Sequence, residues 1–117
     1  MKKSGYKYQI EQALLREDWE IKTIYSTSAW WVDEYWQVQD VHNPEVSFYL
    51  CFIVDPMFEG KREKDQGIHE VKASTSFPEN WNDDRTQIAS ISMTKRKFEE
   101  KLNLFLEDLK RFKEAFH

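Results

Sequence analysis

The spacing of apolar residues changes along the chain, and the order of these changes predicts the order of helices and strands. Apolar residues recur every three to four positions over 8–17, which is typical of a short amphipathic helix. Segments with period-two or continuous apolar character predict strands over 19–26, 30–41, 46–54, 68–76 and 86–93. Because 46–54 is apolar almost throughout, we expect it at the centre of a covered sheet.

The clearest periodic segment lies at the C-terminal end, where apolar residues are separated alternately by four and three positions. These residues are Phe98, Leu102, Phe105, Leu109, Phe112 and Phe116. The spacing predicts an amphipathic helix of about 20 residues, roughly 30 Å long, beginning near Thr94. Thr94 is a suitable N-cap, and the basic residues Lys110, Arg111 and Lys113 favour the C-terminal end of the helix dipole.

The predicted order is helix, four to five strands, helix. Successive strands without long crossovers imply an antiparallel sheet, and each one-sided helix is best buried against a face of that sheet. We therefore predict an α+β fold: an antiparallel four- to five-stranded sheet with a short N-terminal helix and a long C-terminal helix packed on it. A length of 117 residues fits one such domain, 1–117.

Alternation within the strands sorts the aromatic residues by sheet face. One face of 19–26 is expected to carry Trp19, Ile21, Thr23 and Tyr25. One face of 30–41 is expected to carry Trp30, Val32, Glu34, Trp36 and Val38. Trp31 and Tyr35 fall on the other face of 30–41, so helices on one side only would leave this pair exposed as a partner-binding patch. The alternative is that the helices and the curling sheet bury both aromatic sets.

Composition narrows the class of protein. The single cysteine, Cys51, lies inside an apolar run, which rules out an intrachain disulfide or a multi-thiol zinc site and favours a reducing, cytoplasmic setting. No apolar run approaches the roughly 20 residues of a membrane helix, so no membrane partner is expected. The chain has 21 acidic and 17 basic residues, so it lacks the excess of positive charge with which nucleic-acid binders contact phosphates.

Motifs for catalysis are absent from the sequence: it has no nucleophile motif, glycine-rich phosphate loop or metal-ligand spacing, so we expect no cofactor and no metal. Two weaker sites remain open. His69 is the best candidate for a ligand-binding or catalytic imidazole, with Glu34 as its partner, although a structural histidine explains it as well. Thr94, Lys95, Arg96 and Lys97 stand at a helix start and would bind an anion, or else form an ordinary solvated first turn.

Several short segments resemble a family of small uncharacterised proteins from cyanobacteria and plastids. The resemblance rests on 54–60, Gln66-Gly67, 73–75 and 92–96. It covers most of the chain and implies a cytosolic or stromal setting, but it carries over no catalytic residue.

The abundant aromatics and the acidic balance favour a non-enzymatic protein-binding or regulatory module with an unidentified protein partner. The alternative is a small-ligand or anion-binding protein, possibly enzymatic, that uses His69 or the helix start at Lys95 to Lys97. A homodimer is compatible with either hypothesis.

Overall fold

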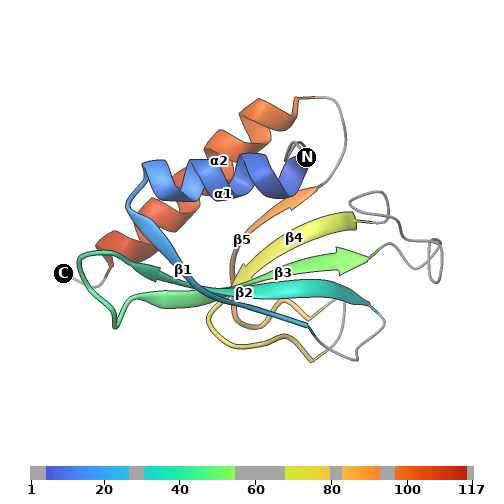
Figure 1. Ribbon diagram of the computed structural model, residues 1–117, viewed down its shortest axis with the longest axis horizontal. Helices are drawn as coiled ribbons and strands as arrows, with labels where there is room; N and C mark the ends of the chain where they lie inside the picture. The colour runs from blue at the N-terminus through green and yellow to red at the C-terminus, as the bar shows by residue number, and fades with distance from the viewer. Residues whose placement is uncertain (1–4, 27–30, 55–67, 80–82, 93–96, 116–117) are drawn as a thin grey trace.

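The computed structural model describes residues 5–26, 31–54, 68–79, 83–92 and 97–115. Their elements, in chain order, are α1 (Tyr6–Arg16), β1 (Trp19–Tyr25), β2 (Val32–Asp40), β3 (Ser47–Val54), β4 (Ile68–Ser74), β5 (Gln87–Ser92) and α2 (Phe98–Glu114). The strands form one sheet in the order β1-β2-β3-β4-β5, and every neighbouring pair is antiparallel (Figure 1). The predicted α+β fold is confirmed, including the fifth strand and the central place of β3.

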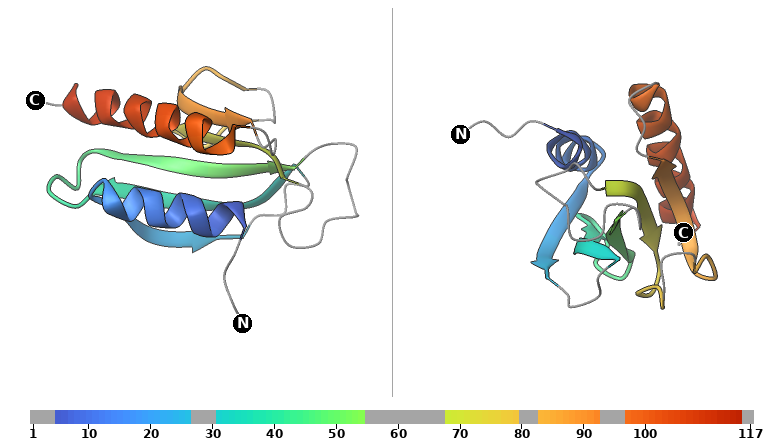
Figure 2. Two further views of the ribbon diagram at one scale, coloured as in Figure 1. Left: turned by 90° about the horizontal axis from the view of Figure 1, so that it is seen from above. Right: turned by 90° about the vertical axis from the view of Figure 1, so that its right-hand side faces the viewer.

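Both helices lie side by side on one face of the sheet and run in the same direction (Figures 1 and 2). The main core fills the space beneath them. It contains Ile10, Ala13 and Leu14 from α1, Leu50 and Phe52 from β3, and Leu102, Phe105 and Leu109 from α2. Burying a side chain such as Phe105 contributes about 1.5–3 kcal/mol, so this apolar interface accounts for much of the stability of the fold.

The C-terminal helix begins later than its periodicity predicts. Lys97, with φ of 58°, occupies the N-cap position of α2, and Phe98 is the first helical residue. Thr94 is therefore not the N-cap, and it lies outside the described residues. The physical reason is tertiary: the Phe98 ring packs on Tyr6 of α1 with centroids 4.5 Å apart, which anchors the start of the helix there. A lysine in the left-handed region costs about 1–2 kcal/mol, which this packing offsets.

A β-bulge in β1 overturns part of the predicted alternation. The register with β2 shifts between Ile21 and Thr23, so the two ends of β1 present their odd-numbered residues to opposite faces. Trp19 lies in the core beneath the helices, whereas Tyr25 stacks on Tyr35 on the other face. The prediction that Trp19, Ile21, Thr23 and Tyr25 share one face is wrong for this reason.

A second bulge lies in β2, where the register with β3 shifts between Val32 and Tyr35. Val32 packs with Trp31, Cys51 and Ile53 on the face away from the helices, and not with Trp36 and Val38 as predicted. The extra residue in the bulge changes the face to which the preceding side chain points.

Neither described helix combines the length and the apolar character that a bilayer span requires.

Candidate functional site: the aromatic face

Five aromatic side chains gather on the sheet face turned away from both helices. We call this set the aromatic face: Tyr25, Trp31, Tyr35, Tyr49 and Phe77. The first four come from β1 to β3 or the residue just before β2, and Phe77 follows β4. The described parts of the β4–β5 connection, 75–79 and 83–86, pass beneath the sheet on this side (Figure 1).

The rings of the aromatic face form one continuous group with Tyr35 at its centre. Tyr25 stacks on Tyr35 with centroids 4.8 Å apart and planes inclined by 18°. Tyr49 meets Tyr35 edge-on at 6.0 Å, and Phe77 packs on it at 4.7 Å. Phe77 also contacts Trp31, at 5.9 Å. Each such aromatic pair adds about 0.5–1.5 kcal/mol beyond its buried area, so the arrangement is held in place before any partner arrives.

The two predicted partner-binding residues lie on the same face, but they are not equally accessible. Tyr35 is partly exposed, whereas Trp31 is only 8% exposed, because it packs against Phe77 and the buried residues Val32, Cys51 and Ile53. Trp31 therefore forms the base of the cluster. The accessible apolar surface comes from Tyr35 and from residues that the sequence did not single out, including Phe77, which is 36% exposed.

Hydroxyl and carboxamide groups lie beside the rings of the aromatic face. The pKa of Tyr35 is raised above its usual value, first by burial and then by the neighbouring Tyr25 and Tyr49 phenols and Cys51. The Tyr25 hydroxyl donates to Gln37 Oε1 at 3.2 Å. Phenol and carboxamide groups beside aromatic rings suit the recognition of neutral polar groups.

A buried lysine anchors the β4–β5 connection beneath the aromatic face. Lys72 is 2% exposed, and its Nζ forms an ion pair with Asp84 Oδ1 at 2.6 Å and donates to the Asp83 carbonyl at 3.3 Å. Asp83 in turn accepts hydrogen bonds from the backbone N–H groups of Glu79 and Arg85 and from the Arg85 guanidinium. The Arg85 guanidinium and these N–H groups hold the pKa of Asp83 well below its usual range. These contacts fix the path of the connection that carries Phe77.

Cys51 lies opposite Lys72 in the sheet and is fully buried. Burial raises the pKa of the Cys51 thiol to about 12, although the nearby Lys72 opposes this shift. The thiolate is the nucleophilic form of cysteine, so this thiol is poorly suited to nucleophilic chemistry in the folded state. In the described part of the chain, no cluster of three or more metal-ligating side chains is present.

Glu34 lies away from the aromatic face and is engaged on the helix side. Its carboxylate accepts a hydrogen bond from Trp36 Nε1 at 3.2 Å and forms an ion pair with Lys7 of α1 at 3.3 Å. His69 belongs to β4, and β3 separates that strand from β2. The side chain of His69 lies outside the described residues, so its predicted ligand-binding role stays a prediction.

The predicted anion site falls mostly outside the description. Thr94, Lys95 and Arg96 are not among the described residues, and Lys97 is the N-cap of α2. The first turn of α2 carries Glu99 and Glu100, whose negative charges already complement the helix dipole. Anion binding at this helix start stays a prediction.

Sequence reasoning missed three members of the aromatic face for separate reasons. The bulge in β1 changed the sheet face on which Tyr25 lies. The run around Tyr49 is apolar throughout, so it does not indicate which sheet face each of its residues occupies. Phe77 follows a strand, where periodicity carries no information. Its position before Pro78 in a loop was the only available signal.

Comparison of the chain with protein-family models, curated proteins and solved structures finds no match. The resemblance to small cyanobacterial and plastid proteins therefore stays a prediction, and the function has to be argued from the side chains themselves.

Proposed function

We propose that the protein is a non-enzymatic protein-binding module that contacts its partner through the aromatic face. The observation that carries this proposal is the continuous group of five rings on the sheet face that neither helix covers. Tyrosine and tryptophan are the residue types most enriched at energetically important interface positions. Tyr35, at the centre of the group, is its expected hot spot.

The charges around the site favour an uncharged partner segment. Beside the rings, the described polar groups are phenols and the Gln37 carboxamide. The charge of Lys72 is compensated by Asp84, and Glu70 lies on the same face on β4, opposite Ile53. A charged partner side chain packed on the rings themselves would lose hydration without an opposite charge beside it, whereas backbone carbonyls and apolar side chains lose little. We therefore expect an extended, apolar protein segment that offers carbonyl acceptors to the tyrosine hydroxyls.

Two observations on Cys51 support the proposal. The first concerns binding in preference to catalysis, and the second agrees with a reducing compartment such as the cytoplasm. The raised pKa of Cys51 removes the most obvious nucleophile on this side of the sheet. The same cysteine is free and buried, so no disulfide holds the fold. The small-ligand alternative at His69 or at Lys95 to Lys97 falls mostly outside the described side chains and stays a prediction.

The test is a selection from a displayed library of disordered protein segments, followed by affinity measurement on the recovered segments. We expect uncharged, apolar segments to be enriched and Tyr35→Ala to weaken them at least tenfold, which corresponds to about 1.4 kcal/mol. Leu104→Ala is the control, because Leu104 is an exposed apolar residue on α2, on the opposite side of the sheet. Equal losses in both variants, or a failure to enrich any segment, would reject the proposal.

A further inference from the structure

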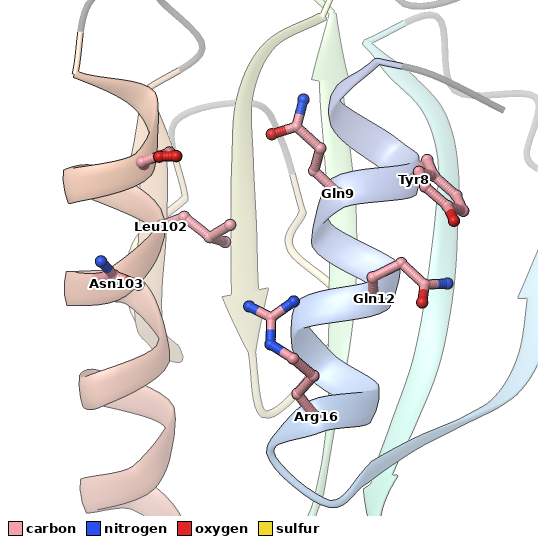
Figure 3. Close-up of a pocket in the computed structure, with 7 residues that line it drawn as sticks. Tyr8, Gln9, Gln12, Arg16, Leu102 and Asn103 are labelled. Atoms are coloured by element: carbon pink, nitrogen blue, oxygen red, sulfur yellow. The ribbon is translucent and has the colours of Figure 1, made fainter.

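A hollow of about 330 Å³ lies between the two helices, on the opposite side of the sheet from the aromatic face. It is lined by Tyr8, Gln9, Gln12 and Arg16 from α1 and by Glu99, Leu102 and Asn103 from α2 (Figure 3). We call it the inter-helical hollow. Its volume is at the lower end of the range for small-molecule sites, roughly 300–1,000 Å³.

The lining of the inter-helical hollow has an unusual chemical composition. It contains one cation, one anion, a phenol and three carboxamides, and Leu102 is its one aliphatic residue. Figure 3 shows the Gln9 side chain extending from α1 toward α2, whereas Gln12 and the one carboxamide of α2, Asn103, are directed away from the facing helix. Each carboxamide both donates and accepts hydrogen bonds. This lining suits a ligand that is itself rich in amide groups.

The two charges lie toward opposite ends of the hollow. The helices run in the same direction, and the contact between Tyr6 and Phe98 places their first turns together. Glu99 is in the first turn of α2, whereas Arg16 is the last residue of α1. Tyr8 and Arg16 are eight positions apart, which corresponds to about 12 Å along the helix axis, so the hollow is elongated between a negative and a positive end.

Arg16 differs in its partners from Arg85 and Arg111, the other arginines among the described residues. Arg85 forms an ion pair with Asp83 at 2.9 Å, and Arg111 is paired with Asp108. Among the described residues, Arg16 has no carboxylate within ion-pair distance, although Glu99 lines the same hollow. The guanidinium is thus available for a bidentate contact with a ligand carboxylate.

We propose that the inter-helical hollow binds a short peptide of two or three residues with free termini. Its carboxylate would pair with Arg16, its ammonium with Glu99, and its peptide groups with the Gln9 carboxamide. An extended peptide of this length spans about 7–10 Å, which matches the hollow once the two charged side chains reach inward. A free amino acid carries both charges on one carbon and is too short to engage both ends. This site is separate from the aromatic face and does not depend on it.

The experiment is an NMR titration of the full chain with trialanine. The signals followed are the backbone amide of Leu102 and the side-chain amide groups of Gln9, Gln12 and Asn103. We expect saturable shifts with a dissociation constant of about 1 mM or tighter, weakened at least tenfold by Arg16→Gln or by Glu99→Gln. Arg111→Gln is the matched control, since it removes an exposed arginine outside the hollow and should leave binding unchanged.

Two companion ligands separate the parts of the proposal. N-acetyl-trialanine amide, which lacks both charges, is expected to cause no saturable shift, and free alanine is expected to bind at least tenfold more weakly than trialanine. The absence of saturable shifts with trialanine, or equal binding by wild type and Arg16→Gln, would overturn the site. Equal affinity for alanine would overturn the assignment of the two charges to opposite ends. Tyr35→Ala should bind trialanine normally, so failure here is distinguishable from failure of the aromatic face.

Discussion

The ion pair between Lys72 and Asp84 offers the sharpest test of how the aromatic face is assembled. The Lys72 side chain is 3% exposed, while that of Asp84 is 69% exposed, and their charged atoms are 2.6 Å apart. Asp84→Ala would leave a buried ammonium whose described remaining contact is one carbonyl, that of Asp83. Lys72→Met would instead remove the charge and keep an apolar side chain of similar length.

The expected magnitudes follow from this asymmetry. Breaking a fully buried pair costs about 3–5 kcal/mol, whereas an exposed pair contributes about 0–1 kcal/mol. Because only one partner is buried, we expect Asp84→Ala to lower the free energy of unfolding by about 2 kcal/mol. Replacing the lysine removes the buried charge itself, so Lys72→Met should cost less than about 1 kcal/mol. The double variant should then be no less stable than Asp84→Ala, because the unpaired charge is gone.

Urea unfolding of the four proteins measures these differences as a double-mutant cycle. Asp108→Ala is the control, since it breaks the exposed pair with Arg111 on α2 and should change stability by no more than about 0.5 kcal/mol. If Asp84→Ala were no more destabilising than Asp108→Ala, or if the double variant were the least stable of all, the buried ion pair would not anchor the connection beneath the aromatic face.

Two further perturbations test the core and the cysteine. Phe105→Ala should lower the free energy of unfolding by about 3–5 kcal/mol, because this ring is buried between α2 and the sheet. Leu104→Ala, at a 61% exposed position, should change it by no more than about 0.5 kcal/mol. Equal losses in urea unfolding would place the buried face of α2 elsewhere. Cys51 has a folded-state pKa of about 12 against an ordinary value of 9.0, so the stability due to its protonated form is present below pH 9 and is lost as the pH rises toward 12. The urea midpoint should therefore fall more steeply above pH 9 in the wild type than in Cys51→Ala, and parallel pH profiles would contradict the raised pKa.

Local periodicity was sufficient to predict the order and type of the elements. The stripe of Phe98, Leu102, Phe105 and Leu109 is buried as its four-three spacing requires, and the continuously apolar strand is the central one. Such patterns are readable because a helix or strand must place its apolar residues on one side to bury them. The placement of Tyr35 opposite Trp36 followed from the same rule. Trp31 precedes both the strand and its bulge, so alternation does not account for its contact with this face.

The candidate sites depended on features that periodicity does not contain. One additional residue in β1 and another in β2 turned Tyr25 and Val32 to the face away from the helices. Phe77 reaches the aromatic face from a connection fixed by Lys72 and Asp84, and that contact depends on the path of the whole loop. Neither a bulge nor a loop path has a repeat that sequence spacing reports.

The sequence by itself determined an α+β domain with one-sided helices, a central apolar strand and an aromatic-rich sheet, because each of these follows from interactions within a few residues of chain. Only the tertiary structure decided which rings meet around Tyr35 and that Arg16 and Glu99 line one hollow. Those arrangements depend on strand register and on the separation of two helices that are distant in the chain, and both are set by the packing of the complete core.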